Sequence, residues 1–372
     1  MRDFLLRPFE ARDWPDMVRF YEEFYRPGYI FTNPAFFEWN FASPLRPDKR
    51  SGQRLALDQD KIIGIIGVLA WPLQVAGAET RGQIPINLYL DPAYRGQPLL
   101  GQRLFQSGTF GYRYSLSLGY RARTLSMFKR MGKVYHWHMR RFVKCLDAER
   151  ATTLLAESPH FTTLGLAEQE AVSSRVQHST TISTPAPSLI IQRQERFDAT
   201  WDEAWEEIRQ GYGFTTWRTS AFLNWRYIDY PVPLYTCLVA RDGARIAGLI
   251  VLRIETPPSG TIVRIVDWVA GTRARRDLLA AAEQVAREHT AIFLDYIAAG
   301  ELDETLLAEA GYQEFSAMNG AMLLPVDFAP IRHRDSILGL VTFLDRNDPS
   351  CTDFDQGRYY FVKGDGDQDR AN

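Results

Sequence analysis

The sequence repeats itself once, at a spacing of about 180 residues. The block AFFEWNFASP around Trp39 recurs as AFLNWRYIDYP around Trp225, 186 positions further on. The block MFKRMGKVY around Gly132 recurs as LLAEAGYQE around Gly311, 179 positions further on. Further blocks recur between these in the same order. A single repeat of this length indicates a duplicated domain, because solenoid repeats have periods of roughly 20–50 residues.

The size and composition fit two soluble globular domains. A chain of 372 residues with 45% hydrophobic and 24% charged residues is typical of such proteins. The formal net charge of −2 gives no reason to expect nucleic acid as a partner. Basic residues are frequent between 121 and 144, and we interpret most of them as solvated surface.

The cysteines and the apolar runs favour a cytoplasmic protein. Cys145, Cys237 and Cys351 are odd in number and widely spaced, so neither a disulfide framework nor a zinc site follows from them. The N-terminus does not resemble a signal peptide, because charges flank a very short apolar run. The most apolar stretch, residues 62–78, contains three glycines and a proline, and we expect a buried strand there and no membrane span.

Periodicity predicts the same element order in both copies. Each copy is expected to contain a strand, helices, a meander of three strands, a helix, a strand, a helix and a final strand. In the first copy the final strand is predicted over 135–146, and in the second, late strands are predicted at 322–324 and 359–362. The fold class is therefore α/β (α+β), with a mixed central sheet flanked by helices in each copy.

Composition sets the expected domain boundaries. The segment 151–187 is rich in Ala, Ser and Thr and includes the run STTISTPAPS, so we predict a linker there. The first domain is then 1–150 and the second 188–372. The C-terminal run with Asp365, Asp367 and Asp369 is expected to be a solvated acidic tail.

A strand-to-helix junction in the first copy carries the clearest chemical signal. The strand ending at Leu90 leads into DPAYRGQPLLG, in which Gly96 precedes a predicted helix. Such a turn presents unpaired N–H groups and the positive end of a helix dipole. The sequence therefore predicts a pyrophosphate-binding corner.

This junction resembles the acyl-CoA-binding motif of the GNAT superfamily of N-acyltransferases, and the element order agrees with the GNAT plan over most of each half. The motif FLNWRY at 222–227 and the tail GDGDQDR at 364–370 resemble tandem GNAT-like proteins of bacterial polysaccharide gene clusters. The resemblance implies acetyl-CoA or another acyl-CoA as co-substrate. The residues it places around that cofactor are Leu88, Leu90, Tyr94, Arg95, Gly96, Gln97, Leu99, Leu100 and Gly101.

The chain departs from the family pattern at several positions. Pro98 stands where a glycine is usual and has no N–H to offer a phosphate. Many GNAT enzymes carry a tyrosine that protonates the leaving thiolate, and the matching residues here are Phe128 and Leu307. The second copy keeps one glycine, Gly271, and starts its helix with arginines, so we expect it to have lost acyl-CoA binding.

The candidate catalytic residues are Tyr89, His136 and His138. The two histidines flank Trp137 and would share one face of a strand, and imidazole suits proton acceptance near neutral pH. Partnered or surface histidines are the plainer alternative. No metal site is expected, since no further ligand has motif spacing.

The candidate acceptor-binding residues are Trp39, Asn224 and Arg226, which are expected at the seam between the copies. The two polar residues could bind a sugar or a carboxylate, although a capping or buried role fits them equally well.

Two functions follow from the sequence. The first is an acyl-CoA-dependent N-acyltransferase that moves an acetyl or short acyl group to an amine, with an amino sugar or polysaccharide precursor as the implied acceptor. The alternatives are a catalytically silent GNAT-shaped scaffold, favoured by Phe128 and Pro98, and a Fem-type aminoacyl transferase, which the neutral charge makes less attractive. The oligomeric state is left open.

Overall fold

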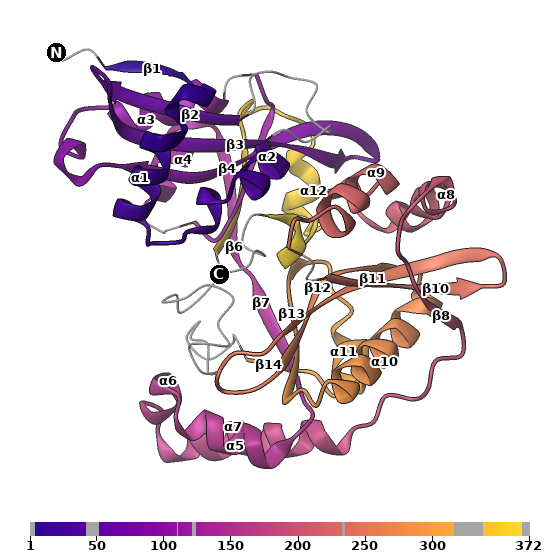
Figure 1. Ribbon diagram of the computed structural model, residues 1–372. Coiled ribbons are helices and arrows are strands. Elements are labelled where there is room, and N and C mark those ends of the chain that lie inside the picture. The colour runs from indigo at the N-terminus through magenta and orange to yellow at the C-terminus, as the bar shows by residue number, and fades with distance from the viewer. Residues whose placement is uncertain are drawn as a thin grey trace.

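A computed structural model describes residues 4–41, 52–109, 111–120, 124–232, 235–315 and 338–366. Its two mixed sheets, each of eight strands, lie one above the other in Figure 1. Helices cover both sheets, so the predicted fold class, two tandem α/β units with mixed sheets, is confirmed. The strand predicted at 322–324 lies outside the described residues.

The first sheet, sheet A, contains the N-terminal strands. Its order is β1-β2-β3-β4-β5-β15-β6, and β9 pairs with the far end of β3. The neighbours pair antiparallel except β4 and β5, which are parallel. The strands are β1 (Leu5–Pro8), β2 (Gly52–Asp58), β3 (Lys61–Val75), β4 (Ala78–Leu90), β5 (Tyr114–Leu118), β15 (Leu338–Phe343), β6 (Lys133–His138) and β9 (Phe214–Thr216).

The second sheet, sheet B, repeats this plan. Its order is β14-β7-β13-β12-β11-β10-β8, with β16 pairing to β13, and β12 and β13 are its parallel neighbours. The strands are β14 (Gln313–Glu314), β7 (Arg140–Cys145), β13 (Phe293–Gly300), β12 (Ile262–Ala270), β11 (Arg245–Glu255), β10 (Tyr235–Asp242), β8 (Ile190–Arg193) and β16 (Tyr360–Val362).

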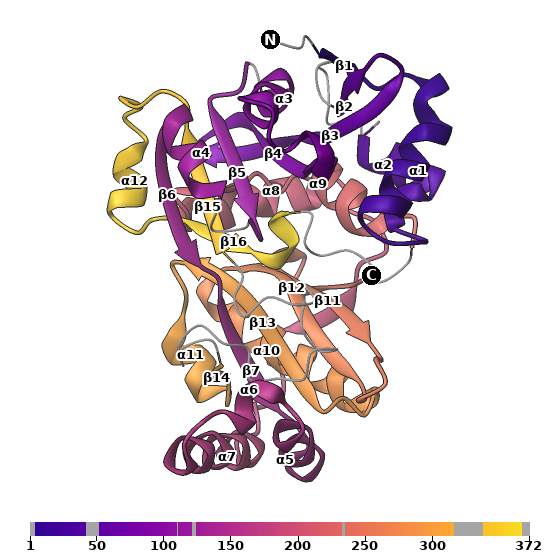
Figure 2. The same ribbon diagram turned by 90° about the vertical axis from the view of Figure 1, so that its left-hand side faces the viewer.

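Each copy contributes one strand to the sheet of the other copy. The single strand predicted over 135–146 is in fact two: β6 stays in sheet A, and after Met139 the chain continues as β7 in sheet B, between β13 and β14. Figure 2 shows β6 running directly into β7. In return, β15 from the C-terminal part lies between β5 and β6 of sheet A. Sheet membership therefore crosses the boundary predicted at 150, and the sequence did not reveal the exchange.

Helices pack against both sheets. In the first copy α1 and α2 cover one face of sheet A, and α3 and α4 cover the other. In the second copy α10 contacts β10, β11 and β12. The helices are α1 (Trp14–Phe24), α2 (Pro34–Phe41), α3 (Leu100–Thr109), α4 (Leu125–Met131), α8 (Ala199–Ile208), α9 (Ser220–Leu223), α10 (Thr272–Glu288), α11 (Glu304–Glu309) and α12 (Cys351–Asp355).

The segment predicted as a linker is largely helical. It holds α5 (Ala148–Ala156), α6 (Pro159–Thr162) and α7 (Leu166–Thr181), which lie below sheet B in Figure 1. Buried Leu155, Val172 and Val176 pack with Val143 of β7 and Phe293 of β13 in one cluster. This segment therefore covers the exchanged strand as well as joining the two copies.

The two copies meet around equivalent tryptophans. The indole rings of Trp39 and Trp225 stack with centroids 5.0 Å apart and planes 15° apart. Each indole N–H donates to the other residue's carbonyl oxygen, at 2.9 Å from Trp39 Nε1 and 3.2 Å from Trp225 Nε1. Because both residues come from the repeated block, this reciprocal contact marks a pseudo-twofold axis between the copies.

Candidate functional site

A slot opens in sheet A where the parallel strands β4 and β5 separate. They pair only at Gly82 with Tyr114 and at Gln83 with Ser115. Beyond that point β4 continues for seven residues and β5 for three, and no strand of the described residues pairs with β4 on that edge. Strands that part in this way leave backbone groups that a ligand can meet.

A bulge interrupts β4 in the stretch that borders this slot. Asn87 and Leu88 together lie opposite the single residue Ile66 of β3, and Asn87 has a positive φ of 51°. Tyr25 Oη donates to the Asn87 carbonyl at 3.0 Å, and Tyr29 Oη donates to Asn87 Oδ1 at 2.9 Å. A bulge re-aims the backbone of a strand. The two tyrosines hold this one in place, and the sequence did not predict it.

The predicted phosphate corner follows β4 directly. The short helix η3 (Pro92–Tyr94) is capped by Asp91, whose Oδ1 accepts from Ala93 N at 2.9 Å. Burial acts to raise the pKa of Asp91, but hydrogen bonds from Lys61 Nζ and Ala93 N hold that pKa below its usual value. The corner is thus fixed by an ionised carboxylate on its inner side.

Several backbone amides of the corner face no acceptor. The N–H groups of Gly96, Leu99, Gly101 and Gln102 have no hydrogen-bond partner among the residues that the structure describes. They lie around the start of α3, where the helix dipole adds positive potential. A Cβ at Gly96 would meet no atom within 4 Å, so the space above this turn is open.

The side chains of the corner are arranged around Tyr89. The guanidinium of Arg95 lies 4.9 Å from the ring centroid of Tyr89, and Arg95 Nε donates to Leu90 O at 3.2 Å. Tyr94 Oη donates to Asp58 Oδ2 at 2.8 Å. Leu100 is buried, whereas Arg95 and Leu99 are exposed. The structure therefore brings the predicted cofactor residues to one place, with an exposed cation beside unpartnered amides.

Comparison with solved structures shows which fold this is. Saccharomyces cerevisiae N-myristoyltransferase with bound myristoyl-CoA is similar at a TM-score of 0.54 and 10% identity, over 92% of this chain and 79% of that one. A GCN5-related N-acetyltransferase from Anabaena variabilis gives 0.55 and 14%, over 92% and 73%. The chain has a tandem GNAT-like fold. A GCN5-related N-acetyltransferase from Kribbella flavida gives 0.53 and 13%, over 91% and 70%.

Sequence comparison adds nothing to this likeness, because no known protein family and no characterised protein matches the chain. At these identities the solved structures establish the GNAT-like fold. The activity has to be argued from the site itself.

The structure does not bring the candidate histidines to the GNAT-like slot. His136 and His138 lie exposed on one face of β6, as predicted, but β15 and β5 separate β6 from β4. At about 4.8 Å per strand, the histidines are about 14 Å from β4 in the plane of the sheet. Tyr89, the third candidate, lies beside Arg95 at the slot and does not contact them.

Phe128 is core, but a tyrosine lies next to it. Phe128 of α4 is buried, and its ring centroid is 5.3 Å from that of Phe105 and 6.2 Å from that of Tyr120. Tyr120 lies two residues beyond the end of β5, the strand that forms one side of the slot. Burial raises the pKa of Tyr120, which keeps its hydroxyl protonated. Sequence alignment alone could not reveal this neighbour.

The candidate acceptor residues differ in their surroundings. Asn224 Nδ2 donates to Phe197 O and Asn224 Oδ1 accepts from Phe197 N, both at 2.9 Å, so its amide serves the backbone. Arg226 is buried, and its Nε and Nη2 donate to Gly364 O and Gly366 O at 3.1 and 3.2 Å. The buried structural role that the sequence offered as an alternative to acceptor binding therefore describes both Asn224 and Arg226 well.

A small pocket lies at the seam beside the tryptophan pair. It spans about 300 Å³ of space that is partly open to solvent. Its walls come from both copies and from the C-terminal segment: Phe31, Phe36, Trp39, Asn40, Leu69, Trp71, Trp225, Arg226, Tyr230 and Gly366. Leu69 pairs with Ile84 of β4, close to where β4 and β5 part. The pocket therefore lies near the closed end of the slot.

The described residues hold no group of three or more His, Cys, Asp and Glu side chains placed to bind a metal ion. Among the described helices, none combines the length and apolar character needed to span a bilayer.

Proposed function

We propose that this protein is an acyl-CoA-dependent N-acyltransferase whose donor site lies in the first copy. The observation that carries the proposal is the open β4–β5 slot, with the bulge at Asn87 on one side and unpartnered amides at its mouth. Its GNAT-like neighbours include an N-myristoyltransferase with bound myristoyl-CoA. An acetyl or other short acyl group is the proposed cargo.

The corner residues have distinct proposed roles toward the cofactor. The amides around Gly96 and Gly101 would hold the diphosphate of CoA, and Arg95 would add a cation. Pro98 supplies no N–H, which removes one hydrogen bond, typically worth about 1 kcal/mol. The backbone at Leu88 to Leu90 would polarise the thioester carbonyl through its N–H groups.

The proposed reaction is direct transfer. The amine nitrogen attacks the thioester carbonyl carbon and forms a tetrahedral intermediate. The carbon–sulfur bond then breaks, the amine gives up a proton, and the thiolate takes one. We propose Tyr120 as the donor of that proton, since Phe128 has none to give and Tyr120 lies against it. Tyr89, His136 and His138 stay predictions, and only Tyr89 lies beside the slot.

The seam pocket is the proposed acceptor site. Trp39 and Arg226 line it, and an amino sugar or polysaccharide precursor is the acceptor that the sequence resemblance favours. Asn224 does not line this pocket, and its amide is bonded to Phe197. We therefore retain Trp39 and Arg226 in the proposed acceptor site and assign Asn224 the role of holding the backbone of Phe197.

A thermal-shift assay with CoA and acyl-CoAs of different chain length tests the donor site. A ligand at about one hundred times its dissociation constant adds about 2.7 kcal/mol to the free energy of unfolding, which raises the melting temperature visibly. Arg95→Glu is expected to abolish the shift. Arg273→Glu makes the same charge change at the exposed start of α10 in the second copy and is expected to leave the shift intact.

A folded protein that shows no shift with any acyl-CoA would exclude the transferase and favour the silent scaffold. A shift with CoA but no thiol release in the presence of amines would favour a CoA-binding scaffold. A Fem-type aminoacyl transferase would instead respond to charged tRNA, and its binding would weaken steeply with added salt.

A further inference from the structure

The second copy has the same fork as the first, but a strand fills it. The parallel strands β12 and β13 pair from Ile262 with Phe293 to Ile265 with Tyr296 and then part. Past that point β16 pairs antiparallel with β13, where Ala298 faces Val362 and Gly300 faces Tyr360. Ala298 also pairs with β7 on its other edge, so β16 lies on the edge that β12 has left.

The segment 360–366, which we call the strap, also touches the other wall of the fork. It consists of β16, the short helix η8 (Lys363–Asp365) and Gly366. Tyr360 Oη donates to the carbonyl oxygen of Trp268 on β12 and lies 2.7 Å from Tyr296 Oη on β13. A Cβ on Gly364 would overlap Tyr227 Oη and press on Val266 O of β12. The strap therefore spans the gap between the two strands.

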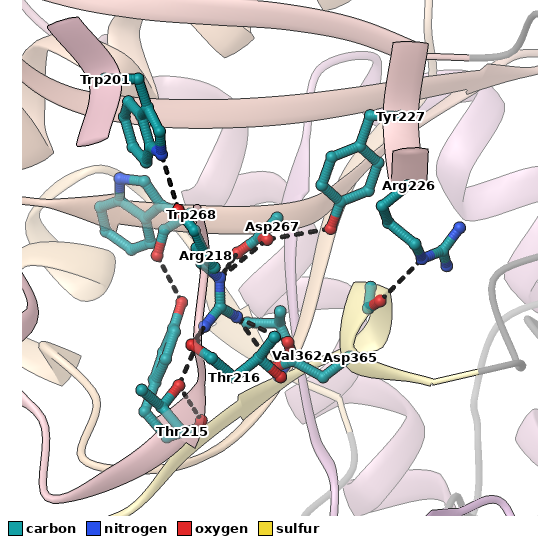
Figure 3. Close-up of polar contacts among 12 residues, drawn as sticks. Trp201, Thr215, Thr216, Arg218, Arg226, Tyr227, Asp267, Trp268, Val362 and Asp365 are labelled. Atoms are coloured by element: carbon teal, nitrogen blue, oxygen red, sulfur yellow. Dashed lines mark hydrogen bonds and ion pairs between the residues drawn. The ribbon is translucent and has the colours of Figure 1, made fainter. Parts of the chain in front are cut away.

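A buried charge cluster holds the far end of the strap. Arg218 Nη2 donates to Asp365 Oδ1 at 2.7 Å, and Arg218 Nε lies 3.0 Å from Asp267 Oδ2 on β12. All three side chains are at most 1% exposed. Asp365 Oδ2 also accepts from Val362 N at 2.8 Å, which ties η8 back to β16. Figure 3 shows the guanidinium lying between the two carboxylates.

This finding corrects the prediction for the C-terminal run. Asp365 was expected in a solvated acidic tail, but it is buried, and Lys363 and Gly364 are buried with it. Asp367 and Asp369 lie outside the described residues. Burial of a carboxylate requires a partner, and Arg218 supplies it.

Little of the second fork remains accessible. A pocket of about 270 Å³, partly open to solvent, is lined by Tyr212, Trp268, Arg275, Tyr296 and Tyr360 together with the loop 301–303. The tyrosine of the strap forms one of its walls. The helix α10 also begins at Thr272, directly after Gly271, so no extended turn like residues 91–99 separates strand and helix in this copy.

The strap continues from the second copy to the first. Gly366 lines the seam pocket, and its Cβ position lies 3.2 Å from Leu118 Cδ1 on β5. Arg226 fixes this end through the carbonyl oxygens of Gly364 and Gly366. Figure 3 shows Arg226 beside this part of the strap. The same seven residues thus fill one fork and form a wall beside the other.

We infer that the strap is an internal ligand of the second copy, which takes the place that acyl-CoA has in the first copy, so that the chain binds one acyl-CoA. This inference rests on the proposed function for the identity of the ligand. It explains why duplication leaves one donor site: the second fork is closed by strand pairing, by Tyr360 and by the Arg218–Asp365 ion pair. Arg226 then acts as a positioning residue for the wall of the seam pocket.

Equilibrium dialysis of the full chain with CoA tests the stoichiometry. One CoA per chain is expected, and Arg95→Glu should remove it. Two CoA per chain, or one CoA that survives Arg95→Glu, would overturn the inference while leaving a CoA-binding protein. Binding of no CoA would instead contradict the proposed function, and that result is distinct from the other two.

Hydrogen exchange tests the strap directly and needs no variant. Amides of 360–363 are expected to exchange as slowly as those of β13, with or without CoA, whereas CoA should slow exchange in β4 and the turn 91–99. Faster exchange of the strap on adding CoA would show displacement and overturn the inference. Asp365→Asn should speed exchange of the strap at least tenfold and change the CoA dissociation constant less than twofold, while Asp355→Asn on the exposed end of α12 is the matched control.

Discussion

The exchanged strand β7 is tied to the second copy by a buried ion pair, and breaking that pair gives a stringent test. Lys144 Nζ of β7 lies 2.6 Å from Glu283 Oε2 of α10, with exposed side-chain fractions of 0% and 6%. Burial lowers the pKa of Lys144. Burial acts to raise the pKa of Glu283, but hydrogen bonds from Lys144, Thr184 and Arg287 keep that pKa below its usual value.

Glu283→Gln removes the carboxylate and leaves the ammonium group buried. Apart from the neutral amide oxygen that the substitution introduces, Thr184 Oγ1, at 3.1 Å, is then the remaining acceptor for Lys144 Nζ among the described residues. Removing one partner of a buried pair typically costs about 3–5 kcal/mol. The double change Lys144→Met with Glu283→Leu should cost about 1 kcal/mol or less, because it leaves no buried charge and the lost pair to Arg287 is half exposed.

Urea unfolding followed by tryptophan fluorescence measures these differences. Glu288→Gln, on the exposed side of the same helix, is the control and should change the free energy of unfolding by less than about 0.5 kcal/mol. Since the folded-state pKa of Glu283 is depressed, its contribution is present above about pH 4.5 and is lost as the pH falls through the folded value. If Glu283→Gln lowers the free energy of unfolding by less than about 1 kcal/mol at pH 7, the claim that this ion pair stabilises the exchanged strand β7 is refuted.

Three further outcomes follow from the site and the strap. Tyr120→Phe should lower the rate of thiol release about 10²-fold without changing CoA affinity, and should remove any alkaline limb of the pH profile. Gly300→Ala should cost at least about 2 kcal/mol, because φ is +97° and a Cβ would overlap a neighbouring carbonyl oxygen, whereas Gly243→Ala at φ +61° in open space should cost less. Burial raises the pKa of Asp365 to about 6, so the folded state binds a proton more tightly than the unfolded state does. Lowering the pH from 7 to 5 should therefore stabilise the wild type by about 1 kcal/mol relative to Asp365→Asn, as measured by thermal unfolding. An equal pH dependence of the two proteins would contradict the burial of an ionised carboxylate beside Arg218.

The repeat carried most of what could be predicted about the fold. Local patterns predicted α1, α2, α4 and the β2–β3 meander closely, because apolar spacing, a proline at the helix start and polar turns are encoded within a few residues. The junction after Leu90 was predicted as a corner with free amides, and the structure contains it. Such signals are local, so one sequence is enough to find them.

Long-range pairing was not predictable in this way. The run 135–146 was predicted as one strand, and nothing in it marks Met139 as the point where the chain changes sheets. Strand partners depend on residues more than 150 positions away, such as Asp295, which binds Arg141 of β7 at 2.9 Å. Arg141 belongs to the basic run 121–144, most of which we interpreted as solvated surface, but it is buried, and no local pattern indicates its partner.

The pseudo-twofold axis and the strap together explain how a duplicated fold can end with one open fork. The reciprocal strand exchange and the Trp39–Trp225 contact are equivalent in the two copies, so neither feature determines which fork stays open. The strap breaks that equivalence, because β16 pairs with β13 beside the second fork and no strand of the described residues takes the matching place beside β4. With Asp365 bound to Arg218 in the second fork, only the first fork has, among the described residues, both a gap between its strands and a turn of unpartnered amides. Asymmetry in this protein therefore arises from the strap as well as from the junction after β12, which keeps Gly271 as its one glycine.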